Sequence, residues 1–180
     1  MLLERLFKPR PAREAGRALY AQAVAQARTP ALYADFGAPD TPEGRFELYS
    51  LHVLLLLERL RGAGAEAAEV SQSLFDTYLK DLDHGLRELG VGDLSVGRKM
   101  RRLGEAFYGR GKSFDRAVAS LPDPRPLEAL LVRTVYAEAE ASGSSRLVGY
   151  VTAQRDALAA QPLDALVAGQ ADWAALETPA

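Results

Sequence analysis

The sequence predicts an all-α protein, a single compact bundle of about six to eight helices with a central apolar helix. Apolar residues recur at spacings of three and four along most of the chain, and no stretch alternates apolar and polar residues as a half-buried strand does. Hydrophobic residues make up 48% and charged residues 26% of the 180 residues, which is typical of a folded soluble domain. No repeat of about 20 to 50 residues recurs, so a helical solenoid is not expected.

The N-terminal part of the chain is expected to form one long helix, a short one and a loop. The long helix is predicted at 13–27 and ends before Pro30, because proline disfavours helical geometry in the residue before it. A short helical turn is expected at 31–36. The loop GAPDTPEG at 37–44 contains Thr41, which is placed to cap the following helix.

The helix expected at 42–61 is hydrophobic nearly all round between residues 48 and 57, which places it in the middle of the bundle. His52 lies in this stretch with no serine, acid or second histidine placed to form a dyad, so we expect a buried, hydrogen-bonded core histidine. A helix is also predicted at 67–89. Its apolar stripe consists of Phe75, Leu79, Leu82, Leu86 and Leu89.

The second half of the chain is expected to contain shorter helices separated by glycine and proline. They are predicted at 96–108, 112–120, 126–141 and 146–160, with Gly109 and Gly111 interrupting the first pair. The length suits one domain, in which we distinguish an N-terminal helical segment (1–36), a core (37–120) and C-terminal helices with a tail (121–180).

Charge is unevenly spread, although the net charge is only −2. Residues 1–28 hold six bases and two acids, and residues 98–116 hold seven bases and two acids. Such segments meet anionic lipid, nucleic acid or an acidic protein surface, or they are solvated helix faces. The chain has no cysteine, which excludes disulfides and thiolate chemistry. The longest apolar run, 53–57, is too short to span a bilayer, and we expect an unexported protein.

The tract DLDHGLRELGVGDLSVGRKMRR, residues 81–102, combines acids, a histidine, glycines and bases. It has neither the ligand spacing of a calcium loop nor the glycine pattern of a phosphate-binding loop. Asp81, His84 and Glu88 share one helical face, as the ligands of carboxylate-bridged metal bundles do, but no second helix supplies a matching acid and histidine. Solvated side chains explain these three residues more simply than a metal site.

A tight corner between two helices explains the glycines of this tract. Gly90 is placed as a left-handed residue that ends the first helix, and Val91 would then contact Leu86 as in a Schellman cap. Asp93 or Ser95 can cap the second helix. Side-chain pairs four residues apart are expected before the corner: Asp76–Lys80, Asp83–Arg87 and His84–Glu88.

The bases after the corner need a separate explanation. Arg98 and Lys99 are expected in the first turn of their helix, where a positive charge opposes the helix dipole, and Arg101 and Arg102 follow on the outer side. Two hypotheses stay open. Either these bases meet an anionic group on a partner, or they pair with acids on a neighbouring helix.

Two blocks, RFELYSLHVLLLLERL at 45–60 and SLFDTYLKDLDHGLRELGVGDLSVGRKMRRLGEAFYGR at 73–110, resemble the ubiquinol-cytochrome c chaperone family. The resemblance covers roughly 37–120, the family core, and implies an all-helical protein without enzymatic activity. Its mitochondrial members bind newly made cytochrome b together with a small second chaperone subunit, near the ribosome. The residues that match the shared pattern are Arg45, Phe46, Leu51, His52, Asp81, Asp83, Leu86, Arg87, Glu88, Gly90, Val91, Gly92, Asp93, Tyr108, Gly109 and Arg110.

The sequence departs from the family pattern at two places. Gly97 stands where proline is expected, and His84 and Gly85 replace residues better suited to a helix. A glycine inside a helix costs about 1 kcal/mol relative to alanine, so these departures bear on local stability.

Together, the resemblance and the charge pattern predict an assembly chaperone that holds cytochrome b during assembly of the ubiquinol-cytochrome c reductase, respiratory complex III. Partner contacts are expected from Asp81, Asp83, Arg87, Glu88, Gly90, Val91, Gly92, Asp93, Arg98, Lys99, Arg101, Arg102, Tyr108 and Arg110. Structural roles are expected from Arg45, Phe46, His52, Leu86 and Gly109.

We expect no metal, no cofactor and no sequence-specific nucleic-acid binding. The expected location is the cytoplasm, peripheral at the inner face of the cytoplasmic membrane, with contact through the client or the basic N-terminal segment. The alternatives are a membrane-surface module, a nucleic-acid- or ribosome-binding helical module, and a metal enzyme using His52, Asp81 and His84.

Overall fold

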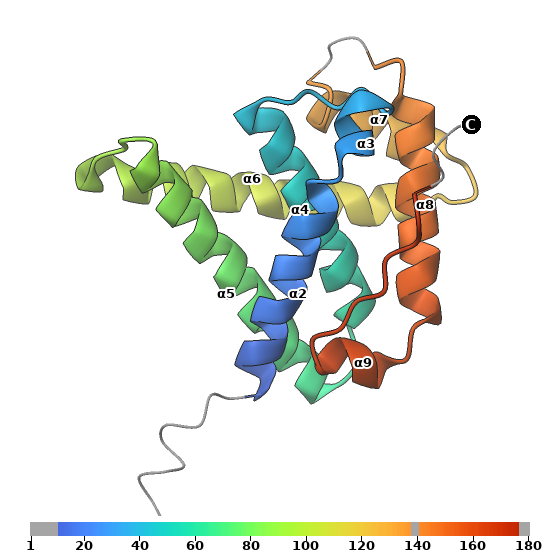
Figure 1. The fold of residues 1–180 in the computed structure, drawn as a ribbon, viewed down its shortest axis with the longest axis horizontal. Helices are drawn as coiled ribbons and strands as arrows, with labels where there is room; N and C mark the ends of the chain where they lie inside the picture. The colour runs from blue at the N-terminus through green and yellow to red at the C-terminus, as the bar shows by residue number, and fades with distance from the viewer. Residues whose placement is uncertain (1–10, 138–140, 177–180) are drawn as a thin grey trace, which may run out of the picture.

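The computed structural model describes residues 11–137 and 141–176, and the chain forms only α-helices, turns and loops within them (Figure 1). The predicted all-α bundle is confirmed. The described helices are α2 (Pro11–Ala27), α3 (Pro30–Ala34), α4 (Pro42–Leu60), α5 (Ala65–Glu88), α6 (Asp93–Ala119), α7 (Arg125–Thr134), α8 (Ser144–Ala160) and α9 (Leu163–Val167). None of them combines the length and hydrophobicity that a bilayer crossing requires. The first ten residues of the basic N-terminal segment lie outside the described ranges.

Helix α4 contacts α2, α5, α6 and α8. Its residues from Leu48 to Leu56 are buried apart from half-buried Tyr49, as the apolar run of the sequence predicts. The helix begins with Pro42 at its first position, and the Thr41 hydroxyl accepts a hydrogen bond from the Gly44 N–H at 3.1 Å. The predicted N-cap at Thr41 is therefore present.

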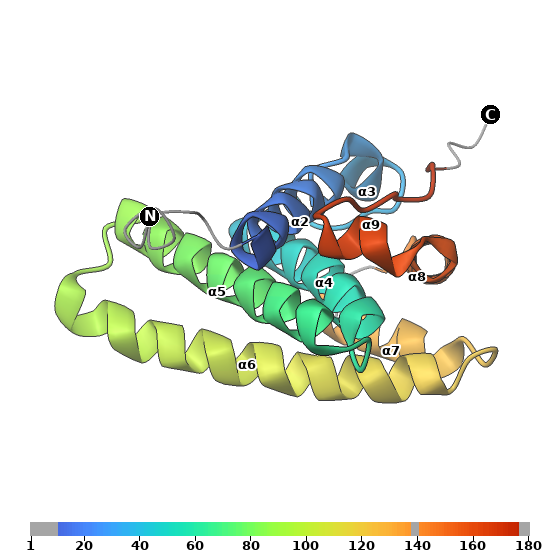
Figure 2. The same cartoon turned by 90° about the horizontal axis from the view of Figure 1, so that it is seen from below.

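Helices α5 and α6 form a long hairpin whose corner projects beyond the rest of the bundle (Figures 1 and 2). Gly90 ends α5 with a φ of +79°, its N–H bonds the Arg87 carbonyl, and the Val91 N–H bonds the Leu86 carbonyl, each at 3.0 Å. This pair of bonds defines the predicted Schellman cap. Leu89 lies at the tip and is 74% exposed.

Helix α6 is continuous, so the predicted break at Gly109 and Gly111 is wrong. Phe107 and Phe114, two turns apart on one face, are both buried, and a Cβ at Gly111 would lie 3.4 Å from Leu54 Cδ2. Packing on both sides of the glycines holds them in the helix against their low propensity.

The start of α6 also differs from the prediction. Gly92 is the N-cap residue, and the Ser95 hydroxyl donates to the Gly92 carbonyl at 3.0 Å instead of accepting from a free N–H. The side chain of Asp93, the other predicted cap, lies outside the described side chains.

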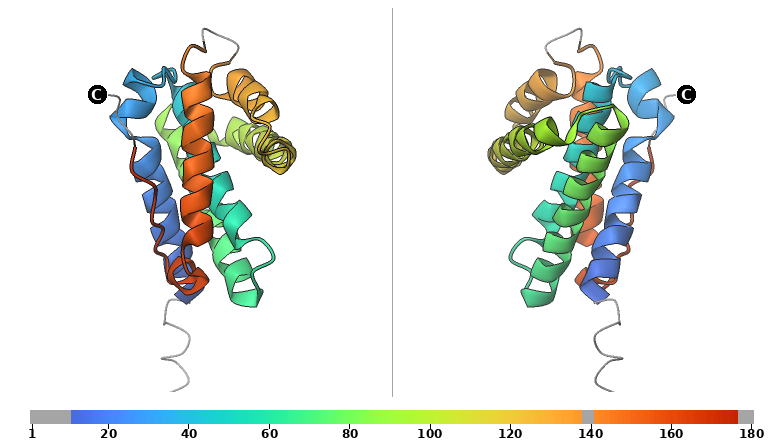
Figure 3. Two further views of the ribbon diagram at one scale, coloured as in Figure 1. Left: turned by 90° about the vertical axis from the view of Figure 1, so that its right-hand side faces the viewer. Right: turned by 90° about the vertical axis from the view of Figure 1, so that its left-hand side faces the viewer.

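The C-terminal third departs furthest from expectation. Helix α7 ends at Thr134 instead of about residue 141, and Ala137 has a φ of +50°; residues 138–140 of the predicted helix lie outside the described ranges. After α8 and the short α9, residues 170–176 form no helix, and this segment runs back between α2 and α8 (Figures 1 and 3).

Candidate functional site

A groove of about 820 Å³ lies between the N-terminal end of α4, the middle of α6 and the C-terminal end of α7. Small residues of α6, Ala106, Gly109 and Ser113, form one side of it, and Leu130 and Val135 contribute apolar surface. The space is open to solvent and large enough for several side chains of another chain.

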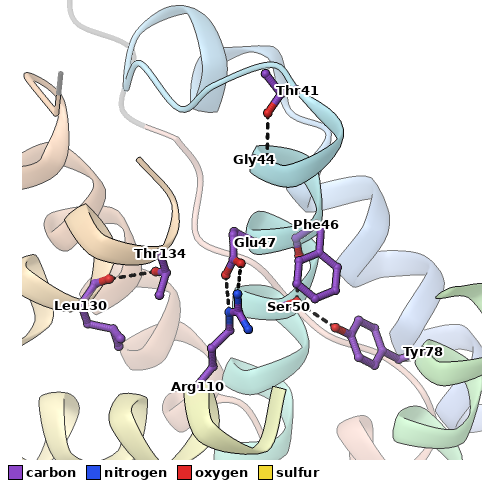
Figure 4. A network of polar contacts seen from close by, with 9 residues as sticks. All are labelled: Thr41, Gly44, Phe46, Glu47, Ser50, Tyr78, Arg110, Leu130 and Thr134. Carbon is purple, nitrogen blue, oxygen red and sulfur yellow. Dashed lines mark hydrogen bonds and ion pairs between the residues drawn. The ribbon is translucent and has the colours of Figure 1, made fainter. Parts of the chain in front are cut away.

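An ion pair between Glu47 of α4 and Arg110 of α6 lies in this groove (Figure 4). The Arg110 Nε donates to Glu47 Oε2 at 2.6 Å, and Arg110 Nη2 donates to the other carboxylate oxygen. The guanidinium carbon also lies 5.4 Å from the centroid of the Phe46 ring. Burial raises the pKa of Glu47, against the lowering effect of Arg110. The pair therefore ties α4 to α6 at a site where an unpaired charge would be costly.

A second polar contact continues from this site into the core. The Ser50 hydroxyl donates to the Phe46 carbonyl at 2.8 Å, so its other contact, 2.8 Å from the Tyr78 hydroxyl, is one in which Tyr78 donates (Figure 4). Burial raises the pKa of Tyr78. These contacts fix the depth at which α5 packs on α4.

The outer side of α6 is the second candidate surface. Its exposed bases, which we call the basic face, are Arg98, Lys99, Arg101, Arg102, Lys112 and Arg116. Within the described part of the chain none of them forms an ion pair, and no described helix covers this side (Figures 2 and 3). The hypothesis that they pair with acids on a neighbouring helix is therefore not supported, and the charges face solvent over about 27 Å of helix.

The helix-dipole argument for this face is wrong. Helix α6 begins at Asp93, three residues earlier than predicted, so Arg98 and Lys99 lie in its second turn. The dipole acts mainly on the first turn, so these bases carry little penalty from it. The exposed bases of the basic face still have no ion-pair partner among the described residues.

The charged residues predicted as partner contacts before the corner form bonds within the chain. The Tyr20 hydroxyl donates to Asp81 at 2.6 Å and links α2 to α5. Arg87 bonds Asp83 at 2.7 Å, and His84 lies 3.1 Å from Glu88, as the spacing predicts. Asp76 accepts from Gln72 at 2.8 Å instead of pairing with the predicted Lys80. The described residues contain no group of three or more acids and histidines that could hold a metal.

The predicted sites beyond the corner divide between two surfaces. Arg110 and Gly109 line the groove, whereas Tyr108 is 67% exposed and lies under Lys112, whose Nζ is 4.7 Å from the ring centroid. Gly90, Val91 and Gly92 form the corner itself. Leu86 is half-buried, and Arg45 is exposed and bonds Asp40 at 2.6 Å.

His52 is fully buried, as expected from its position in the apolar helix. Its Nδ1 lies 2.8 Å from the Leu48 carbonyl and therefore carries the proton, so Nε2 accepts from the Tyr150 hydroxyl at 2.6 Å. Gln26 donates to the same hydroxyl at 3.1 Å. Burial lowers the pKa of His52 to about 4, which keeps the imidazole neutral inside the core.

Sequence reasoning missed Glu47 and the α7 side of the groove. The available signal was an acid between two hydrophobic residues, Phe46 and Leu48, at the start of an apolar helix, where a buried carboxylate needs a partner. The partner, Arg110, is 63 residues away, and only the packing of α6 on α4 reveals it.

Known proteins resemble this chain over most of its length. A family model described as ubiquinol-cytochrome C chaperone matches residues 34–173. A crystal structure of the Cbp3 homolog from Brucella abortus is similar to this chain with a TM-score of 0.86 and 36% sequence identity, covering 97% of each chain. A comparison with curated proteins gave no match.

Proposed function

The chain belongs to the ubiquinol-cytochrome c chaperone family, and from this premise we propose that it binds newly made cytochrome b and holds it during assembly of respiratory complex III. The chaperone role in complex III assembly follows from the family. Cytochrome b as the bound client, and the surfaces that bind it, are our proposal.

The Glu47–Arg110 pair carries this proposal. It brings together the two sequence blocks that resemble the family, 45–60 and 73–110, at the groove. The packing of α4 on α6 does not itself require this open space. Larger residues in place of Ala106, Gly109 and Ser113 would fill it. A groove with apolar walls and a fixed charge pair suits an apolar segment of a membrane-protein client that carries a polar group at one end.

The basic face supports attachment beside the membrane. A newly made membrane protein leaves its apolar segments at a surface of anionic lipid, and unpaired bases on α6 are attracted to such a surface. We propose that the groove takes an apolar segment of the client, while the basic face binds anionic groups of the client and of the lipid surface beside it, so that the protein is peripheral at the inner face of the cytoplasmic membrane. A small second chaperone subunit or the ribosome would meet the remaining surfaces.

We propose that the chain has no catalytic activity. The alternative of a metal enzyme that uses His52 requires an accessible imidazole. This ring is buried, and both of its nitrogens form hydrogen bonds within the core. The carboxylate of Asp81 is held by Tyr20, and His84 is on the exposed side of α5 with Glu88.

Filling the groove tests the proposal. Gly109→Leu places a side chain into the groove, and a Cβ there meets nothing within 4 Å, so the fold has room for it. Gly104→Leu is the matched control, because Gly104 lies in the same helix, also has open space, and does not line the groove. In cells that lack the native gene, we expect Gly104→Leu to restore membrane cytochrome b, measured by its haem absorbance, and Gly109→Leu to fail. Equal restoration by both variants would contradict the groove as the client site.

The basic face also favours a second candidate, a ribosome- or nucleic-acid-binding module. Binding through these bases alone would weaken steeply as salt rises. The sequence pI is about 5.8, and among the described residues Tyr108 is the single exposed aromatic, so the face is a poor platform for stacked bases. Two results together would favour this candidate. The affinity for RNA would fall steeply as salt rises, and the chain would bind RNA at an ionic strength at which it does not capture cytochrome b.

A further inference from the structure

The large hydrophobic side chains that the bundle leaves exposed lie on the α5–α6 hairpin. Within the described part of the chain these are Leu89, which is 74% exposed, and Tyr108, which is 67% exposed. Leu89 is at the corner that projects beyond the rest of the bundle, and half-buried Val91 follows it in the same corner (Figures 1 and 2). The hairpin therefore ends in a small apolar tip that faces solvent.

The turn at this corner gives no reason for a leucine at position 89. The Gly90 N–H bonds the Arg87 carbonyl, and the Val91 N–H bonds the Leu86 carbonyl. In a cap of this kind the hydrophobic contact joins the residues at the ends of the second bond, Val91 and Leu86. Leu89 takes no part in that contact, although the bonds on both sides of it hold its backbone in place. The leucine is thus presented to solvent on a fixed turn.

Exposed bases follow the corner closely along α6. Arg98, Arg101 and Arg102 lie six to ten residues after Gly92, which is about 9 to 15 Å along the helix axis. The headgroup layer on each side of a bilayer is about 5 to 8 Å thick, and anionic lipid attracts bases over roughly a further 8 Å. With Leu89 at the acyl boundary, these bases reach anionic headgroups even when the helix stands upright, and a tilt brings them closer.

Bases outnumber acids at this end of the molecule. Residues 86–102 hold five bases and two acids. Glu88, the acid next to Leu89, lies 3.1 Å from His84. The net positive charge of the corner and the first turns of α6 matches an anionic surface.

The size of the apolar tip favours a bilayer over a folded protein as its partner. A stable protein interface takes about 800 Å² from each side and centres on side chains that fill matched pockets. One exposed leucine and one half-buried valine supply far less apolar area. A bilayer accepts a protruding apolar side chain without a matched pocket, and its anionic lipids add an attraction for each nearby base.

We propose that the corner of the α5–α6 hairpin is a membrane-insertion element. Leu89 enters the acyl boundary of an anionic bilayer, and Arg98, Arg101 and Arg102 bind the phosphate groups of its lipids. This inference rests on the membrane attachment proposed above, and it adds the residue that enters the bilayer.

A dye at the corner tests insertion directly. The chain has no cysteine, so one introduced cysteine carries an environment-sensitive nitrobenzoxadiazole dye at one position. In the full chain, Leu89→Cys places the dye at the corner, and Ala25→Cys places it on exposed α2, across the bundle from α6 (Figure 2). With vesicles of phosphatidylcholine and phosphatidylglycerol in equal parts, we expect the corner dye to shift to the blue and to be quenched by lipids spin-labelled in the acyl chain. The α2 dye should do neither.

An unlabelled variant separates insertion from the attraction of charge. Leu89→Ser changes an exposed side chain, so it should keep native helical circular dichroism and weaken vesicle affinity about tenfold. A larger loss with Tyr108→Ser than with Leu89→Ser would place the membrane contact along α6 and overturn insertion of the corner. Unchanged vesicle affinity of Leu89→Ser, with reduced capture of cytochrome b from detergent, would assign the corner to the client instead.

The vesicle assay also separates this inference from the function proposed above. Binding of the wild-type chain to anionic vesicles without a shift of the corner dye would overturn insertion and leave the membrane attachment of the basic face in place. No binding of the wild-type chain would overturn both. Neither result bears on cytochrome b as the client, because the assay contains none.

Discussion

Arg110 binds both carboxylate oxygens of Glu47 and joins α6 to α4 beside an open groove. The Glu47 side chain is 10% exposed and the Arg110 side chain is 26% exposed. The pair is therefore both a tie between two helices and part of a surface that a partner can reach.

Removal of one member of this pair should destabilise the fold. Arg110→Met leaves the Glu47 carboxylate buried and unpaired, and we expect the free energy of unfolding to fall by about 2 to 4 kcal/mol. The double variant Glu47→Met with Arg110→Met should recover most of this loss, because neither charge remains. Urea unfolding of the two single variants and the double variant measures the coupling. Purely additive losses would contradict the pairing.

The buried His52 should make stability pH-dependent. Its pKa is about 4 in the folded protein against an ordinary value of 6.5, so between these values the unfolded state binds more protons and stability falls with falling pH. The full loss amounts to about 3 kcal/mol between pH 7 and pH 4. His52→Gln removes this group while it can still bond Leu48 and Tyr150. The free energy of unfolding of both proteins is measured from pH 4 to pH 7. The difference between wild type and variant should change with pH as a single histidine titrates, and a difference that is constant with pH would contradict the buried neutral His52.

Two glycines at the end of α5 should respond in opposite ways to the same substitution. Gly90 has a φ of +79°, so Gly90→Ala forces a left-handed alanine and should cost about 1 to 2 kcal/mol. Gly85 lies inside the helix, and a Cβ added there would have nothing within 4 Å, so Gly85→Ala should gain up to about 1 kcal/mol. Thermal unfolding of the two variants checks the signs. A gain at Gly90 would show that the corner is not held as described.

Reversal of the basic face should leave the fold intact. Arg98, Arg101 and Arg102 are exposed and form no ion pair with any described residue, so their replacement by glutamate should change the free energy of unfolding by no more than about 1 kcal/mol. Chemical denaturation measures this directly. A loss of several kcal/mol would mean that these bases support the structure.

Local rules predicted the features that depend on a few neighbouring residues. The cap at Thr41, the left-handed Gly90 and the pair of Asp83 with Arg87 each follow from spacing along one segment, and all three are present. The buried state of His52 followed from the apolar residues around it in α4. In each case the determining atoms lie within about one turn of helix.

Features that depend on packing between distant segments were not predicted. Gly109 and Gly111 suggested a break, but the burial of Phe107 and Phe114 keeps α6 continuous. Gln154 is fully buried because its amide bonds the backbone of Ala174, 20 residues further along the chain, and no local rule predicts this contact. Propensity describes the helix alone, and the tertiary contacts override it.

Capture of cytochrome b by the tagged chain, from detergent-solubilised membranes, tests the central claim most directly. We expect the wild-type chain to recover cytochrome b, and reversal of Arg98, Arg101 and Arg102 to glutamate to reduce recovery. The matched reversal of Arg13, Arg17 and Arg146, exposed bases outside α6, should not reduce it. If a folded wild-type chain recovers no cytochrome b, the proposed client is wrong; if both reversals recover it equally, the basic face has no part in binding.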